Sequence, residues 1–298
     1  MKIGFGAPVA GAWATAANVA RFAESAEKLG YSSLWTFHRL LVPAEHGLDA
    51  VYRSVLDPTV AMSFMAARTS TIRLGVALIN FPFASPAYVA KQFSTLDLLS
   101  GGRVDLGLGA GWLPDEFVAS GASMERRGAR TVEYVQVLRT LFADEVSSFD
   151  GEFYTVPPSR MDPKPVQKPG PPVLLGGAVP AALKRAGRIA DGWMSRSATN
   201  LDEIAAQIAI VRAGAAEAGK DPAGVRVVVR GVVRPGERVG RLSGSYSQIR
   251  ADAEWLGEQG VTELFYDLNW DPRIGNPDAS VHTATETAHD LLEALKPS

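Results

Sequence analysis

The sequence predicts a (β/α)₈ barrel, in which eight parallel strands alternate with eight helices. Short β-rich runs are followed, in strict alternation, by longer segments whose apolar residues recur at helical spacing. Eight such units fit a chain of 298 residues, because barrels of this kind typically need about 250. We therefore expect one domain over residues 1–298, with the excess length in loop insertions at the C-terminal face of the barrel.

The first four units carry recognisable helix start and stop residues. Gly30 follows the first apolar helical stripe, and Asp57-Pro58 is a capping residue followed by proline. Strands are predicted over residues 3–6, 32–36, 72–79 and 103–108, and helices over residues 16–29, 57–68, 86–99 and 124–142.

The remaining units follow an interruption of the pattern. Asp150-Gly151, between alternating apolar residues, predicts a β-hairpin over residues 147–156 that lies outside the barrel. A proline-rich crossing then leads to the fifth unit. Strands are predicted over residues 173–175, 192–194, 225–233 and 262–266, and helices over residues 180–189, 201–218, 248–259 and 281–295.

Four connections are long enough to expect a function for them. Irregular loops beyond about 12–15 residues usually have a specific role in compact domains. Three of the long connections follow the second, fourth and seventh strands, on the face where barrel enzymes carry out their chemistry. The four stretches are residues 37–56, 109–123, 143–171 and 234–246.

Composition excludes several classes of function. The chain has no Cys, so disulfides, a thiolate nucleophile and iron–sulfur ligation are excluded. A formal net charge of -2 argues against a nucleic-acid or membrane-surface partner, since both require a concentrated basic face. No apolar run approaches the ~18 residues of a membrane span. We expect a cytoplasmic protein that acts on a small molecule.

His38 is the histidine best placed for chemistry. It follows Trp35-Thr36-Phe37 at the predicted end of the second strand, where an imidazole can donate or accept a proton. The alternative is a loop histidine that only forms a hydrogen bond. The others, His46, His282 and His289, are scattered, and without a metal-binding spacing a metal site is not expected.

Glycines gather where predicted strands end. Gly109 and Gly111 follow the fourth strand, and Gly176-Gly177-Ala178 follows the fifth and opens a helix. Glycine lets a ligand approach the backbone, and a helix N-terminus favours a phosphate. Gly6, at the end of the first strand, has the same two interpretations as the others: a ligand contact or a tight turn.

Aromatic and arginine side chains accompany these glycines. Trp112 directly follows a glycine turn on the predicted active face and is the aromatic residue best placed to contact a flat ligand. Other aromatic residues near strand ends either line the barrel mouth or belong to the core. Three arginines are possible anion contacts or partners in ion pairs: Arg39, Arg196 and Arg230.

These motifs, taken together, resemble the bacterial luciferase-like superfamily of flavin and deazaflavin oxidoreductases. The resemblance covers residues 1 to about 270, and its most specific part is the run from Leu96 to Trp112. The form Gly109-Ala110-Gly111-Trp112 is similar to the branch that uses coenzyme F420, although FMN-dependent members look much alike. Further matching segments are residues 90–92, 116–117, 163–167, 171–177 and 190–193, together with Gly121.

The resemblance implies a cofactor ring in the barrel mouth, with its phosphate near Gly176-Gly177. It also implies a non-proline cis peptide in a bulge of the third strand, which we place at Ala77-Leu78, and a homodimer. The candidate catalytic residues are His38 and Trp112. The candidate cofactor-binding residues are Gly6, Ala77, Leu78, Gly109, Gly111, Gly176, Gly177 and Ala178.

One departure from the family affects the expected substrate. The branch that resembles sugar-phosphate dehydrogenases has a carboxylate–His pair after the second-strand Trp and a Glu at the position of Trp112. This chain has His38-Arg39 and Trp112 there, which argues against sugar-phosphate oxidation. We therefore expect F420-dependent hydride transfer on another small organic substrate. The alternatives are an FMN-dependent monooxygenase and a cofactor-binding protein without catalysis.

Overall fold

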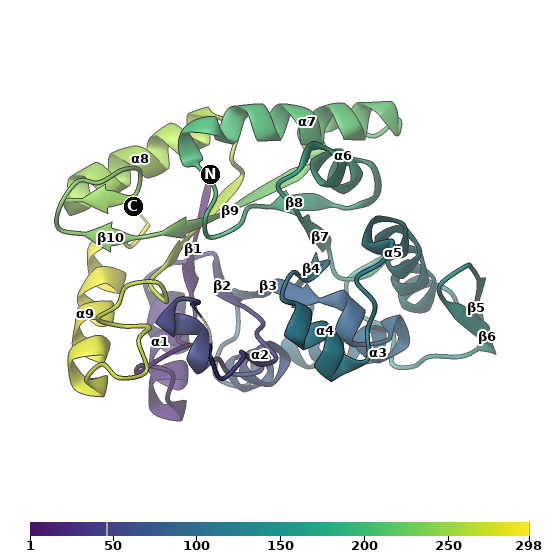
Figure 1. The fold of residues 1–298 in the computed structure, drawn as a ribbon, viewed down its shortest axis with the longest axis horizontal. Helices are drawn as coiled ribbons and strands as arrows, with labels where there is room; N and C mark the ends of the chain where they lie inside the picture. The colour runs from purple at the N-terminus through teal and green to yellow at the C-terminus, as the bar shows by residue number, and fades with distance from the viewer. Residues whose placement is uncertain (46, 298) are drawn as a thin grey trace.

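Eight parallel strands close into a barrel in the computed structural model, which describes residues 1–45 and 47–297 (Figure 1). The order around the barrel is β1-β12-β9-β8-β7-β4-β3-β2, so the predicted (β/α)₈ architecture is confirmed. His46 lies outside the described residues. The barrel strands are β1 (Lys2–Gly6), β2 (Ser33–Thr36), β3 (Arg73–Asn80), β4 (Val104–Gly109), β7 (Val173–Gly176), β8 (Gly192–Met194), β9 (Arg226–Val232) and β12 (Glu263–Asp267).

The helices begin where capping residues satisfy their first N–H groups. Thr15, Asp57 and Ser85 each accept a backbone hydrogen bond at the start of α1, α2 and α3. Their bounds and those of the other helices are α1 (Ala16–Lys28), α2 (Pro58–Ala66), α3 (Pro86–Ser100), α4 (Pro114–Ser120), α5 (Arg127–Ala143), α6 (Pro180–Ile189), α7 (Ile204–Glu217), α8 (Tyr246–Glu258) and α9 (Val281–Ala294).

Three helix predictions need correction. The predicted loop 109–123 contains α4, whose available sequence signal was Pro114 at the first position with acidic residues after it. α5 begins at Arg127 rather than residue 124, because Arg126 adopts a left-handed conformation with φ of 52°. α8 begins at Tyr246, before the predicted residue 248, because Ser245 and Gln248 form a capping box.

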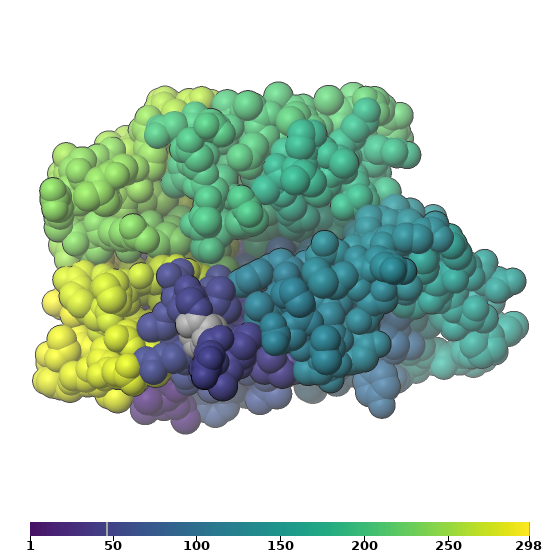
Figure 2. All heavy atoms as spheres, in the orientation of Figure 1, coloured from purple at the N-terminus to yellow at the C-terminus, as the bar shows by residue number. Residues whose placement is uncertain are grey.

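Two small sheets lie outside the barrel. The predicted hairpin is confirmed as antiparallel β5 (Ser147–Asp150) and β6 (Thr155–Ser159), at the right edge of Figure 1. β10 (Arg234–Pro235) and β11 (Ser243–Gly244) pair within the predicted loop 234–246. Figure 2 shows the green residues of the C-terminal half lying above the purple-to-teal residues of the N-terminal half.

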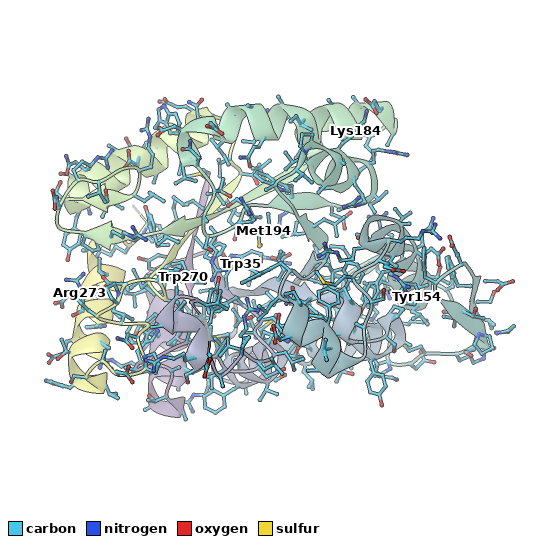
Figure 3. All side chains as sticks on the ribbon, viewed as in Figure 1. Trp35, Tyr154, Lys184, Met194, Trp270 and Arg273 are labelled. Atoms are coloured by element: carbon cyan, nitrogen blue, oxygen red, sulfur yellow. The ribbon has the colours of Figure 1, made fainter. Side chains whose placement is uncertain are left out.

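The middle of the barrel interior is apolar. Trp35 and Phe265 stack with ring centroids 5.5 Å apart, and Met194 packs against them (Figure 3). Gly75 makes room for this layer, since a Cβ there would lie 2.3 Å from the ring of Trp35. The layer is completed by Ala77, Leu174 and Val228.

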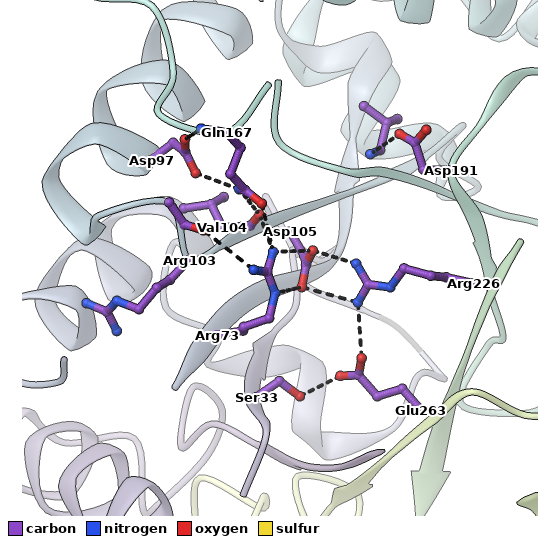
Figure 4. A network of polar contacts seen from close by, with 12 residues as sticks. Ser33, Arg73, Asp97, Arg103, Val104, Asp105, Gln167, Asp191, Arg226 and Glu263 are labelled. Carbon is purple, nitrogen blue, oxygen red and sulfur yellow. Dashed lines mark hydrogen bonds and ion pairs between the residues drawn. The ribbon is translucent and has the colours of Figure 1, made fainter. Parts of the chain in front are cut away.

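Below this apolar layer, charged side chains from several strands form one network (Figure 4). The carboxylate of Asp105, on β4, is fully buried and pairs with Arg73 at 2.8 Å and Arg226 at 2.6 Å. Arg226 also pairs with Glu263 at 3.0 Å, and Ser33 donates to the other oxygen of that carboxylate. Burial works to raise the pKa of Asp105, but its arginine partners outweigh burial and lower it.

We predict that Asp105→Asn lowers the free energy of unfolding by roughly 2–4 kcal/mol. Breaking a buried pair leaves charge uncompensated, although the two arginines keep some solvent contact. Because the pKa of Asp105 is lowered in the folded state, its contribution is present at neutral pH. It is lost as the pH falls below the unfolded value of about 3.9. Urea unfolding at pH 7 and below pH 4 measures both effects.

Glu217→Gln is the matched control. Glu217 pairs with Lys184 at 2.7 Å, but both side chains are about half exposed, so its loss should change stability by less than about 1 kcal/mol. Equal effects of the two variants would contradict the structural role of Asp105.

Candidate active site

A cavity of about 780 Å³ opens at the C-terminal ends of the barrel strands. It brings together residues that the sequence places far apart, from the ends of β2, β3, β4, β7, β8 and β9. Nine of the ten predicted site residues line it: His38, Ala77, Leu78, Gly109, Gly111, Trp112, Gly176, Gly177 and Ala178.

Gly6 is the exception, because it lies outside the cavity lining. A Cβ at this position would meet the Oδ1 of Asp267 at 2.9 Å. The need for glycine here is explained by packing against Asp267, and no contact with the cavity accompanies it.

The floor of the cavity is formed by the bulged segment of β3. The peptide bond between Ala77 and Leu78 is cis, and the β3–β4 register shifts between Val76 and Ile79, as predicted. The side chain of Leu78 fills the space left by two glycines. A Cβ at Gly176 would lie 2.2 Å from Leu78, and one at Gly109 would lie 3.2 Å from it.

One end of the cavity lies at the start of α6. Gly177 has φ of 153° there, and a Cβ would lie 2.6 Å from that of Ala182. The indole Nε1 of Trp193 donates to the Gly177 carbonyl at 2.9 Å, which fixes the turn. Val179, the N-cap, provides no side-chain cap, and the proline that follows it has no N–H. The N–H of Ala182 donates to the Val179 carbonyl at 2.9 Å, so in the first turn of α6 the N–H of Ala181 stays open for an anion.

Three arginines line the cavity, one of them on α6 itself, and we call them the cationic end: Arg127, Arg185 and Arg196. Among the described residues none of the three pairs with a carboxylate, although Arg127 donates to the Gly111 carbonyl at 2.5 Å. Burial alone lowers the pKa of Arg185, which is the expected result when no carboxylate faces it. The cationic end therefore has the charge and donors to hold a phosphate.

His38 lies beside the bulge, and its geometry fixes its tautomer. The backbone N–H of Asn80 donates to Nδ1 at 3.2 Å, so the ring proton resides on Nε2. Burial lowers the pKa of His38 and outweighs the charge of Asp57, which acts in the opposite direction; the charge of Arg39 lowers it further. The imidazole is therefore a neutral hydrogen-bond donor at the cavity near physiological pH.

Arg39, Glu116, Tyr52 and Trp112 form a second group, which we call the aromatic end. The fully buried carboxylate of Glu116 pairs with Arg39 at 2.7 Å and accepts the N–H of Leu40 at 2.7 Å. The guanidinium lies 4.5 Å from the ring centroid of Tyr52 and 4.8 Å from that of Trp112. Trp112 remains 49% exposed, so a large flat surface faces the cavity.

Arg230 connects the aromatic end to the floor. It pairs with Asp267 at 2.5 Å and donates to the Ala77 carbonyl at 3.4 Å. Its guanidinium lies 4.0 Å from the ring centroid of Trp270 and 4.7 Å from that of Phe37. Of the three arginines predicted as anion contacts or ion-pair partners, Arg39 and Arg230 are therefore paired, and only Arg196 is unpaired within the described residues.

Sequence reasoning missed the partners of these residues. Arg127, Arg185 and Tyr52 carry no local motif, and Glu116 belongs to a segment that matches the family but had no role predicted; the fold brings all four to the site. Among the aromatic residues near predicted strand ends, five are buried in the core: Trp13, Trp35, Phe37, Phe81 and Trp193. Of these, only Phe37 also lines the cavity.

Metal-binding groups and membrane-spanning helices are features that bear on other functions. No group of three or more His, Cys, Asp or Glu side chains among them is arranged to hold a metal ion. No described helix is both long enough and apolar enough to cross a membrane.

Comparison with known proteins shows which family this chain resembles. The profile of the luciferase-like monooxygenase family matches residues 3–263. An uncharacterized protein of Mycobacterium tuberculosis is 34% identical over 209 residues, which are 66% of this chain and 71% of that protein.

Two relatives of known activity use different cofactors. An FMNH₂-dependent dimethylsulfone monooxygenase of Pseudomonas putida is 31% identical over 67% of this chain and 53% of its own. An F420-dependent glucose-6-phosphate dehydrogenase of Amycolatopsis mediterranei is 29% identical over 62% of this chain and 55% of its own.

Solved structures share the fold over nearly the whole chain. The monooxygenase RslO1 from Streptomyces bottropensis has a TM-score of 0.81 at 24% identity, covering 99% of this chain and 98% of its own. An F420-dependent secondary alcohol dehydrogenase has a TM-score of 0.79 at 20% identity, covering 99% of both chains. At these identities the similarity concerns the fold alone.

Proposed function

The chain belongs to the luciferase-like monooxygenase family, and on this premise we propose that it transfers a hydride between coenzyme F420 and a small organic substrate. Members and relatives of this family are oxidoreductases that use a flavin or a deazaflavin. The observation that carries the proposal is the cationic end, whose three arginines have no carboxylate partner among the described residues and line the same cavity as the start of α6.

The residues of the cavity fit a flavin-type cofactor. Gly176 and Gly177 line the cavity while Leu78 and Ala182 pack against them, and the open N–H at the start of α6 would bind the phosphate of the cofactor. Ala77 and Leu78 would support the ring system. When bound, the cofactor supplies hydride transfer, which no side chain of the protein can provide.

F420 is favoured over FMN by the charge of the cationic end. The tail of F420 carries a phosphodiester followed by glutamate carboxylates, whereas FMN carries a single phosphate. Three unpaired arginines match the larger number of negative groups. The resemblance of Gly109-Ala110-Gly111-Trp112 to the F420 branch supports the same choice.

His38 would act on the substrate through its Nε2–H. Reduction of a carbonyl or activated alkene develops negative charge on oxygen, and a neutral imidazole donor at that position stabilises the charge. Because the Asn80 N–H engages Nδ1, the ring has no free lone pair with which to accept a proton. This geometry favours reduction of the substrate over its oxidation.

FMN-dependent monooxygenation is the second candidate function. The relative with the FMNH₂-dependent activity is slightly more similar than the F420-dependent one, at 31% against 29% identity. A homodimer and a cytoplasmic location, expected from the sequence, remain predictions.

The first prediction concerns cofactor choice. F420 should bind at least about tenfold more tightly than FMN, a difference of roughly 1.4 kcal/mol. Arg185→Met should weaken both by about tenfold, because each loses a charged contact, while riboflavin, which lacks the phosphate, should bind unchanged. Fluorescence titration measures all three ligands.

Arg188→Met is the matched control, since Arg188 lies on the same helix but outside the cavity lining. Tighter binding of FMN than F420 would favour the monooxygenase. If Arg185→Met and Arg188→Met changed the affinities for F420 and FMN equally, the cationic end would not be the phosphate site.

The second prediction concerns His38. With a substrate that the enzyme reduces, His38→Ala should lower kcat about 10²–10³-fold and leave cofactor affinity unchanged, because one donor to the developing charge is lost. His38→Gln places an N–H at a similar reach and should retain more of the activity.

The pH dependence provides a further check of the same role. Because burial lowers the pKa of His38 from 6.5, the neutral ring persists at higher pH, so kcat should not change with His38 ionisation above pH 6.5. A titration above that pH that disappears in His38→Gln would contradict the assignment.

A further inference from the structure

We infer that the substrate presents an uncharged, flat aromatic or conjugated group to the aromatic end, and that Arg39 is the positioning residue for the rings that bind it. The inference rests on the proposed function, because it takes the cationic end to be filled by the cofactor tail. It extends the proposal by naming the substrate class.

The two ends of the cavity differ in net charge. At the cationic end three guanidinium groups have no carboxylate partner within the described residues. At the aromatic end, each guanidinium is neutralised by a carboxylate that is almost completely buried, Arg39 by Glu116 and Arg230 by Asp267. A negatively charged substrate would therefore find its counter-charge already taken at the aromatic end.

Arg39 lines the cavity, but its guanidinium is almost completely covered. Its side chain is only 4% exposed and lies against the rings of Tyr52 and Trp112. Its Nε atom is buried without a hydrogen-bond partner, so the rings and Glu116 are the contacts that hold the guanidinium. Arg39 thus fixes the positions of the rings by cation–π contact.

The surface left for the substrate is aromatic. Trp112 is half exposed at the cavity, and its ring meets that of Tyr52 at 6.3 Å. Tyr52 in turn meets Trp270 at 5.8 Å, in a neighbouring cavity of about 560 Å³ that shares Tyr52 and Arg230 with the first. Exposed rings beside the neutral donor His38 suit a flat group that carries an oxygen acceptor.

Arg39 joins two long loops to produce this surface. It follows β2, while Glu116 belongs to α4 and Trp112 lies just before that helix. Removing only one member of the pair would leave a buried charge uncompensated. The informative variant is therefore the double substitution Arg39→Met with Glu116→Gln, which removes both charges together.

Three probes of similar size test the substrate class. They are 2-acetylnaphthalene, which is flat and neutral, 2-naphthoate, which is flat and anionic, and 2-acetyldecalin, which is neutral and saturated. Equilibrium dialysis against the protein loaded with F420 should show the first binding at least tenfold more tightly than the other two. Binding of naphthoate or the decalin as tightly as acetylnaphthalene would overturn the inference.

The variants test the positioning role. Arg39→Met with Glu116→Gln should weaken acetylnaphthalene at least fivefold, as should Trp112→Ala, without changing the affinity for F420. Arg39→Lys keeps the charge but not the flat guanidinium, so its affinity for acetylnaphthalene should lie between those of the unmodified protein and the double variant. The control is Phe153→Ala, which removes a ring under Arg126 and Arg130 outside the cavity lining. It should leave the affinities for acetylnaphthalene and F420 unchanged. If the double variant bound acetylnaphthalene as tightly as the unmodified protein, Arg39 would not have this positioning role.

Failure of the two proposals can be distinguished. If neither F420 nor FMN binds, the dialysis is run on the cofactor-free protein, and the proposed function falls while the probe preference still decides the ligand class. If F420 binds but the probes show no preference, the substrate class falls and the proposed function stands.

Discussion

A charged side chain inside the barrel is costly unless it is paired, and this requirement determines where charged groups lie, from the network around Asp105 to the mouth of the barrel. Asp105 pairs with Arg73 on the adjacent strand β3 and with Arg226 on β9, which is not adjacent to β4. Near the mouth, Asp267 pairs with Arg230. Between them the apolar layer around Trp35 excludes water. Because each pair joins different strands, the pairs also fix how the strands are aligned in the closed sheet.

The same requirement locates the functional site. Wherever a guanidinium in the barrel mouth has a buried carboxylate partner, the local charge is balanced. The exceptions line the same cavity as the start of α6. An unpaired cluster of cations costs free energy through mutual repulsion, and a bound anion relieves that cost. The cavity therefore has one end suited to a phosphate and another suited to a neutral, flat group.

Much of the fold could be predicted from the sequence, because barrel units repeat a local pattern. Apolar spacing predicted every barrel strand, and caps such as Asp57-Pro58 predicted where helices begin. The cis peptide at Ala77-Leu78 followed from the family resemblance. α4 was missed because seven residues are too few to show a helical period. The start of α5 was misplaced because nothing local indicates the left-handed conformation of Arg126.

The candidate site was predictable only where its residues follow strand ends. His38, Trp112 and the Gly176-Gly177 turn are of this kind, and all line the cavity. The pairing of Arg39 with Glu116 joins residues 77 positions apart, so no spacing rule could reveal it. The tautomer of His38 depends likewise on the N–H of Asn80, 42 positions away. Sequence therefore named candidate groups, while their charge states required the fold.

A crystal structure of the protein with F420 bound would show whether unpaired charge orients the cofactor. The account predicts that the phosphorus atom lies within reach of the open N–H of Ala181 at the start of α6 and of the Arg185 guanidinium. It also predicts that the ring system rests on Ala77 and Leu78. A phosphate bound instead beside Arg39 or Arg230, whose charges are already neutralised, would contradict the account.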